Sequence, residues 1–248
     1  MQVERYGAGL EVCLGLHGWG GDHRTFTPIA AQLPSSASLY SADLPGCGRS
    51  PAPRDWKAMT IVDEIIATIE AIGADRITLI GNCSGANLAL LAAAKIGPRV
   101  GRLVLIDMFA FMPRYFRLFT NKNFGRYAYY STFANPAGRW VGNQSLRGHR
   151  TTETDLTSSF VAIDHKVAYQ YLLMLSQIEG LEQFRDLKMP IDIVYGERTF
   201  GAVKRSVSQW LALWPHARTW ELKGAGHLPI EEATEQLSRI IFDEEETT

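Results

Sequence analysis

Short apolar runs that alternate with helical stretches constrain the fold of this chain more than any other feature. The runs are rich in β-branched residues, each leads into a loop or a helix, and they occupy residues 11–17, 38–45, 76–81, 102–107, 191–196 and 218–224. Continuous apolar runs of this length are typical of strands buried on both faces in a parallel sheet. Between them, residues 60–74 and 84–97 show helical spacing, with Gly73 and Gly97 placed as helix stops. The alternation predicts an α/β protein with a mostly parallel, doubly wound sheet.

Residues 110–178 interrupt this alternation. They contain no clear buried strand and are rich in aromatic and basic residues, and the strand pattern resumes only after them. We interpret the segment as a helical lid inserted over the strand ends, where ligands of α/β proteins bind. The predicted division is therefore a core of residues 1–109 and 179–248 and a lid of residues 110–178.

The composition narrows the class of protein. A length of 248 residues suits one large domain, and a formal net charge of -1 gives no general attraction to nucleic acid. We expect no signal peptide and no membrane span, because no apolar run approaches the length that a spanning helix needs. Three cysteines are an odd number, which favours a reducing compartment, so we predict a cytoplasmic protein. Spacings typical of metal ligands are absent from the sequence, so we expect neither a metal nor a cofactor.

The stretch GNCSG, residues 81–85, follows one of the predicted strands and opens a predicted helix. Gly81 and Gly85 flank Cys83 at two residues on each side, which allows a sharp strand-to-helix turn without side-chain collisions. Ser84 in the same role would lack this flanking. The start of the helix would direct N–H groups at Cys83 and favour a thiolate. The alternative is that Cys83 is a small buried hydrophobic residue.

Two further stretches carry residue types that such a nucleophile needs. The glycines of HGWGG, residues 17–21, let the backbone approach a ligand, and the main-chain amides of Trp19 and Ser84 could together hold an oxyanion. The stretch GAGH places His227 after a strand and a glycine-rich loop near the end of the sequence. Each stretch alone is a weak signal.

Taken in order, these motifs resemble the α/β-hydrolase superfamily. The resemblance covers nearly the whole chain and rests on HGWGG, DLPGCGRS, GNCSG, the helical insertion, a strand ending in YGE, and GAGH. It implies that Cys83 is the nucleophile, that His227 is the general base, and that the amides of Trp19 and Ser84 form the oxyanion hole. Most members carry serine at the nucleophile, whereas dienelactone hydrolases and polyhydroxyalkanoate synthases use cysteine.

The third catalytic residue departs from the family pattern. The usual aspartate lies after the strand IDIVYG, but the sequence there reads GERTFG and has Thr199 at the expected position. Some relatives, such as haloalkane dehalogenases, place the acid after the preceding strand, where this chain has Asp107. We favour Asp107, with Glu197 as the second candidate, although Asp107 could instead cap a strand end.

The predicted lid has a strong local asymmetry of charge. Between Ala110 and Arg150 the sequence has no Asp or Glu, and its basic residues are Arg114, Arg117, Lys122, Arg126, Arg139, Arg147 and Arg150. Aromatic residues are interleaved with them. On one interpretation this is a solvated helix face above an apolar core. On the other, an apolar pocket has a cationic rim that meets an anion, with the substrate-binding residues Phe111, Arg114, Tyr115 and Arg117.

The sequence therefore predicts a hydrolase that acts on a carboxylic ester or thioester through a covalent Cys-His(-Asp) mechanism. Its partner would be a small acyl substrate, free or carried on coenzyme A or an acyl carrier protein. One alternative is an acyltransferase or cyclase with the same acyl-enzyme. Another is a non-catalytic ligand-binding protein that has lost the usual serine and aspartate. The acyl group, the leaving group and the oligomeric state do not follow from the sequence.

Overall fold

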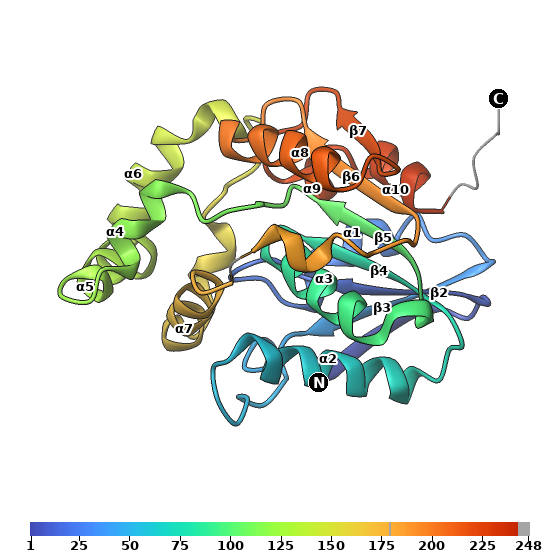
Figure 1. Ribbon diagram of the computed structural model, residues 1–248. Helices are drawn as coiled ribbons and strands as arrows, with labels where there is room; N and C mark the ends of the chain where they lie inside the picture. The colour runs from blue at the N-terminus through green and yellow to red at the C-terminus, as the bar shows by residue number, and fades with distance from the viewer. Residues whose placement is uncertain (179, 243–248) are drawn as a thin grey trace.

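A seven-stranded sheet forms the centre of the computed structural model, which describes residues 1–178 and 180–242 (Figure 1). The strand order is β1-β3-β2-β4-β5-β6-β7. The strands are β1 (Gln2–Gly7), β2 (Glu11–Leu16), β3 (Ala37–Asp43), β4 (Ile77–Asn82), β5 (Val100–Ile106), β6 (Ile191–Gly196) and β7 (Arg218–Leu222). All neighbouring pairs are parallel except β1 and β3. The prediction of a mostly parallel α/β sheet with a helical insertion is confirmed.

The antiparallel edge strand β1 was not predicted. Its register with β3 runs from Gln2 opposite Asp43 to Gly7 opposite Ser38. A strand at the edge of a sheet has one neighbour and is covered less than a central strand, so its sequence QVERYG mixes charged and apolar residues. The continuous apolar pattern that identified the other strands is therefore missing from it.

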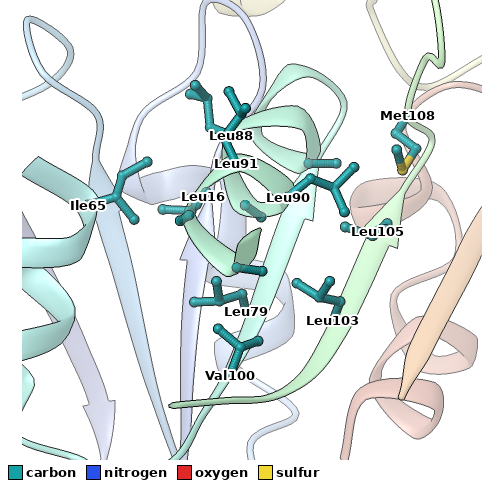
Figure 2. Packing of buried hydrophobic residues seen from close by; sticks show 14 of the residues in the cluster. Leu16, Ile65, Leu79, Leu88, Leu90, Leu91, Val100, Leu103, Leu105 and Met108 are labelled. Carbon is teal, nitrogen blue, oxygen red and sulfur yellow. The ribbon is translucent and has the colours of Figure 1, made fainter. Parts of the chain in front are cut away.

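Alternate residues of the central strands pack into two separate hydrophobic clusters, one on each face of the sheet. Leu79, Leu103 and Leu105 contact α3 (Ser84–Ile96), whose leucines cover them in Figure 2. The same cluster includes buried residues of α2 (Ala58–Ile72) and α8 (Gly201–Leu213). Ile80 and Val104 point to the opposite face, which is covered by α1 (Thr27–Ala30) and α10 (Thr234–Phe242). The two-residue period of a strand thus builds both cores.

Helix α2 shows why the predicted helices end where they do. Ile61, Ile65 and Ile69 are fully buried and form one apolar stripe, as the helical spacing predicts. Gly73 follows the last turn with φ of 75°, and its N–H bonds to the carbonyl of Ile69. A residue with a side chain would be strained in this left-handed conformation, so the glycine terminates the helix.

The predicted lid is helical and contains no strand in the residues that the structure describes between 110 and 178. Its helices are α4 (Arg117–Thr120), α5 (Gly125–Tyr129), α6 (Pro136–Ser145) and α7 (His165–Leu175), with a π-helical turn at Tyr130–Ala134. They lie beyond the end of the sheet to which β5 points (Figure 1). Tyr129, Ala168 and Leu172 are the buried residues of a third hydrophobic cluster there. The predicted boundary at residue 179 falls outside the described residues.

Candidate active site

Cys83 stands at the tip of β4, where the chain turns sharply into α3. Its backbone has φ of 51° and ψ of -116°, a conformation that residues with a side chain seldom adopt. A Cβ on Gly81 would lie 2.3 Å from the Cα of Ala86, and one on Gly85 would lie 2.2 Å from the carbonyl oxygen of Leu16. Both glycines are therefore required by close backbone approach, and together they present the half-buried Cys83 side chain above the sheet.

Asp107 lies at the same edge of the sheet, at the end of the neighbouring strand. Asn82 is in register with Ile106, so Cys83 and Asp107 leave β4 and β5 at the same level. The Asp107 carboxylate is fully buried, and one of its oxygens accepts a 3.0 Å hydrogen bond from the Gly196 amide. Its other oxygen accepts a hydrogen bond from Nδ1–H of His227.

Thr199 occupies the position where the family resemblance led us to expect an acid. It is buried, and its hydroxyl donates to the same Asp107 oxygen that bonds His227. The hydroxyl oxygen also lies 3.4 Å from His227 Nδ1. Glu197, the second candidate acid, instead accepts a 2.8 Å bond from the Gly224 amide at the surface. Of the two candidate acids, the structure brings Asp107 to His227, and Thr199 supports Asp107.

These contacts determine the charge of His227. Burial acts to lower its pKa, but the charge and hydrogen bond of Asp107 raise it, and the side chain of Cys83 adds to the rise through a hydrogen bond and its charge. The net effect raises the pKa of His227 from 6.5 to about 10. The rings of Phe200 and Phe109 enclose the imidazole, with centroids 4.6 and 5.8 Å from its own. At neutral pH His227 is therefore an imidazolium next to Cys83.

The loop of residues 17–21 lies against this turn. A Cβ on Gly18 would be 3.1 Å from the Cβ of Cys83, so the glycine allows the loop to reach the elbow. His17 is buried and neutral, because burial lowers its pKa, and its Nδ1–H donates 2.8 Å to the Gly18 carbonyl. Its Nε2 accepts 3.1 Å from the Leu44 amide, which fixes the tautomer. The ring thereby holds the loop in place.

The two amides predicted to form an oxyanion hole belong to segments that meet at Cys83: Trp19 follows Gly18, which lies against Cys83, and Ser84 follows Cys83 in the chain. The Trp19 amide belongs to the loop and the Ser84 amide is the first of α3. Within residues 1–178 and 180–242, neither amide has a protein acceptor. Amides at a helix start commonly lack an internal acceptor and can donate hydrogen bonds to a ligand anion instead.

The side chain of Trp19 reaches into the lid. Its indole N–H donates 2.7 Å to the Ala168 carbonyl of α7. Its ring contacts those of Phe160 and Phe133, with centroids 4.8 and 4.9 Å away. The residue that supplies one candidate oxyanion amide is thus held by the lid, a link that the sequence motif alone does not reveal.

A cavity of about 730 Å³ opens over Cys83 and His227. Its walls come from the residue 17–21 loop, from the lid and from the start of α8, and are mostly apolar. Of the predicted substrate-binding residues, Tyr115 lines the cavity, whereas Phe111, Arg114 and Arg117 are not part of its described lining. The side chains of Arg114 and Arg117 are exposed to solvent. A role in substrate binding stays a prediction for all of these residues.

Residues 149–154, in the middle of the predicted lid, form a strap that fastens the loop that carries His227. The His227 amide donates 2.8 Å to the His149 carbonyl. The Glu232 carboxylate accepts 2.5 Å from the Gly226 amide and 2.7 Å from the Thr151 amide, and it also accepts from the Thr154 hydroxyl. Sequence reasoning missed this strap, because nothing in the pattern of residues 149–154 indicates pairing with residues 226–232.

A cluster that the sequence spacing did not indicate joins Asp22, His23 and Asp43, whose ligand-type atoms lie within 4.8 Å of one another. The buried Asp43 carboxylate accepts from the amide and Nδ1–H of His23, both at 2.8 Å, and from the amide of Arg49 at 3.0 Å. A Cβ on Gly48 would lie 2.2 Å from the same carboxylate. These bonds tie together the loops that follow β2 and β3, so the cluster serves to fix loops.

Comparisons with known proteins agree with this architecture. The family described as alpha/beta hydrolase fold matches residues 14–234. The 1-acylglycerol-3-phosphate O-acyltransferase ABHD5 of Sus scrofa is 33% identical over 104 residues, which are 40% of this chain but only 30% of that protein. The pimeloyl-(acyl-carrier protein) methyl ester esterase of Salmonella newport (strain SL254) is 26% identical over 236 residues, covering 91% of this chain and 90% of that one.

Solved structures show the same fold. The structure of a thermophilic esterase from Thermogutta terrifontis superposes with a TM-score of 0.79 over 97% of this chain and 90% of that chain. At 19% sequence identity this likeness shows the fold alone. Separately, among the described residues there is no helix whose length and apolar character would let it cross a bilayer.

Proposed function

The chain belongs to the alpha/beta hydrolase family, and we propose that it is a hydrolase of carboxylic esters or thioesters with Cys83 as the nucleophile. His227 acts as the proton donor and acceptor. Asp107 orients the His227 ring and favours its protonated form. The observation that carries the proposal is the Asp107–His227 hydrogen bond together with the place of Cys83 and His227 on the lining of the same mostly apolar cavity.

In the proposed mechanism, the sulfur of Cys83 attacks the substrate carbonyl carbon and a C–S bond forms. The carbonyl oxygen becomes an oxyanion, which the amides of Trp19 and Ser84 stabilise. Collapse of this intermediate breaks the bond to the leaving alcohol or thiol, which takes a proton from His227. Water then attacks the acyl-thioenzyme, His227 accepts the proton from the water, and the carboxylic acid leaves with the Cys83 sulfur restored as its anion.

Cysteine suits this arrangement for an electrostatic reason. The raised pKa of His227 means that the resting ring carries a proton at neutral pH. An imidazolium cannot accept the proton of a serine hydroxyl, but it stabilises a thiolate and is ready to protonate the leaving group. The charged ring therefore favours an anionic sulfur nucleophile at position 83.

For the substrate, we propose an acyl group of modest size in the cavity, free or carried on coenzyme A or an acyl carrier protein. The Salmonella relative is named for an acyl-carrier-protein ester, which supports a carrier-linked substrate. The absence of acidic residues between 110 and 150 supports an anionic or acidic partner at the lid. We retain residues 110–178 as the lid, residues 1–109 and 179–248 as the core, and a cytoplasmic location as proposals.

Acyl transfer is the second candidate. The Sus scrofa relative is named as an acyltransferase, and the apolar cavity walls favour an acceptor other than water. A cyclase would use the same acyl-enzyme. In each case the covalent intermediate on Cys83 is shared, and only the final acceptor differs. A non-catalytic binding protein would form no such intermediate.

The test is intact-mass detection of the acyl-enzyme after brief exposure to a panel of esters and acyl thioesters. We expect a single adduct with the mass of the acyl group in the wild type and in Cys47→Ser, and none in Cys83→Ala. The measured ratio of free carboxylic acid to transferred acyl product then distinguishes hydrolysis from acyl transfer. An adduct that persists in Cys83→Ala, or no adduct together with no turnover of any substrate, would contradict the proposal.

A further inference from the structure

Arg205 gives the cavity its only lysine or arginine side chain among the described lining residues. It projects from α8 on the same face as Gly201 and Ala202, which also line the cavity. The Nη1 atom of Arg205 lies 3.4 Å from the place that a Cβ on Gly201 would occupy. The guanidinium therefore folds over the first turn of α8, toward the end of that helix next to the reaction centre.

The surroundings of that first turn fix its place relative to Cys83 and His227. Phe200, the residue before α8, contacts the His227 ring at 4.6 Å between centroids. The Ala110 amide donates 2.9 Å to the Ser206 hydroxyl, which joins α8 to the start of the lid. Burial raises the pKa of Tyr115 to about 12, the charge of Cys83 adds to this, and the charge of Arg205 opposes it. Tyr115 is half exposed and lines the same cavity as Cys83 and Arg205.

The guanidinium of Arg205 has no carboxylate partner in residues 1–178 and 180–242. The adjacent Lys204, by contrast, pairs with Glu221 at 3.4 Å. Two acidic residues also line the cavity. Asp155 accepts two 2.7 Å hydrogen bonds from Thr157. Glu231 is exposed to solvent, and its pKa is raised by partial burial and by the neighbouring Glu232.

We propose that Arg205, assisted by the hydroxyl of Tyr115, binds a carboxylate or phosphate carried by the substrate, so that this enzyme prefers anionic esters or thioesters. A guanidinium matches either group with two parallel N–H donors. The Arg205 side chain is exposed to solvent, so water screens part of this interaction, and the apolar lining strengthens it only for an anion that lies inside the cavity. The inference rests on the proposed function for its kinetic readout, but the binding of the anion itself does not depend on turnover.

The experiment compares Arg205→Gln with the matched control Lys204→Gln, which removes the same charge from the adjacent residue off the cavity wall. One pair of substrates places the charge on the acyl group: 4-nitrophenyl hemiglutarate against 4-nitrophenyl valerate. A second pair places it on the leaving group: the butyrate ester of 4-hydroxybenzoate against that of methyl 4-hydroxybenzoate. We expect Arg205→Gln to lower kcat/KM about 10- to 100-fold for the anionic member of one pair, because a charge-assisted hydrogen bond is lost. The neutral esters should change less than about twofold, and the affected pair identifies where the anion sits.

Titration calorimetry with glutarate, on wild type and both variants, separates this inference from the proposed function. If no ester is cleaved but glutarate binds the wild type and Lys204→Gln at least about tenfold more tightly than Arg205→Gln, the anion site stands while the hydrolase proposal fails. Equal losses on neutral and anionic esters, equal effects of the two substitutions, or a wild-type preference for a choline ester over its neutral analogue would overturn the assignment of Arg205.

Discussion

At the residue scale, the proposed chemistry of this site depends on a carboxylate whose residue has an unusual backbone conformation. Asp107 has φ of 50°, and its buried carboxylate is satisfied by the Gly196 amide, the Thr199 hydroxyl and the His227 ring. A buried charge needs such partners, since desolvation would otherwise favour its neutral form. The strain and the bonds together aim one carboxylate oxygen at His227.

Thr199→Val tests the contribution of the hydroxyl. It removes one donor to the Asp107 oxygen that bonds His227, and we expect kcat/KM on the best ester to fall about 10-fold or more, as loss of a hydrogen bond to a charged group predicts. Thr199→Ser keeps the donor and should retain most of the activity. Equal activity of Thr199→Val and wild type would show that Asp107 needs no help from residue 199.

The charge of His227 predicts a specific dependence of stability on pH. Because its folded pKa is raised from 6.5 to about 10, the Asp107–His227 pair contributes stability that is fully present below about pH 6.5. That stability declines as the pH rises and is lost as the pH passes through about 10. The difference in unfolding free energy between wild type and His227→Gln, measured in urea, should therefore shrink from pH 6 to pH 10. A constant or growing difference would contradict the raised pKa.

Cys83 and His227 could be predicted from sequence because each lies in a short motif whose glycines have a local steric reason. Asp107 was favoured because some members of the family that the sequence resembles place the acid after the corresponding strand, and Glu197 stayed open as the second candidate. The supporting role of Thr199 could not be predicted, since it depends on where residues 107, 199 and 227 meet in space. From the sequence alone, Thr199 was interpreted as the loss of the usual aspartate. In the structure its hydroxyl donates a hydrogen bond to Asp107.

At the scale of elements, the strap of residues 149–154 and the loop that carries His227 behave as one unit. The Glu232 carboxylate accepts hydrogen bonds from two backbone N–H groups and one hydroxyl of these segments. A Cβ on Gly226 would lie 2.1 Å from the His149 carbonyl oxygen, so the two backbones are in direct contact. The predicted lid is thus joined to the loop that carries His227 as well as to Trp19.

Glu232→Gln should loosen this connection. An amide nitrogen cannot accept a hydrogen bond, so at least one N–H donor of Gly226 or Thr151 is left facing another donor. We expect kcat to fall about tenfold while KM changes little, because the position of His227 is affected more than the cavity walls. Glu235→Gln, an exposed change on α10, is the control. A matching fall in that variant, or no fall in Glu232→Gln, would remove Glu232 from the account.

The buried elements could be predicted from the sequence better than the edge strand β1 and the strap of residues 149–154. The central strands and α2 are buried by their neighbours and therefore carry an unbroken apolar run or an apolar stripe. The edge strand β1 and the strap are defined by backbone pairing with distant segments. This pairing does not require apolar side chains, so their sequences give no comparable signal.

At the scale of the whole molecule, the sheet has a hydrophobic core on each face, and the helical insertion has a small hydrophobic cluster of its own. Leu105 is fully buried between the sheet and α3, whereas Val141 of α6 is 58% exposed. We expect Leu105→Ala to lower the free energy of unfolding by about 2–5 kcal/mol and Val141→Ala by less than about 0.5 kcal/mol, both measured in urea. Similar losses for the two variants would mean that the lid contributes to stability as strongly as the core.

The most direct test of the central claim is the rate at which iodoacetamide alkylates Cys83 at pH 6, followed by peptide mass spectrometry. If the His227 imidazolium holds the sulfur as an anion, Cys83 should react at least about tenfold faster than free cysteine at that pH and faster than Cys47, whose pKa is raised by burial to about 12. His227→Gln should abolish the advantage. A wild-type Cys83 that reacts no faster than free cysteine, or one whose rate is unchanged in His227→Gln, would contradict a thiolate–imidazolium active site.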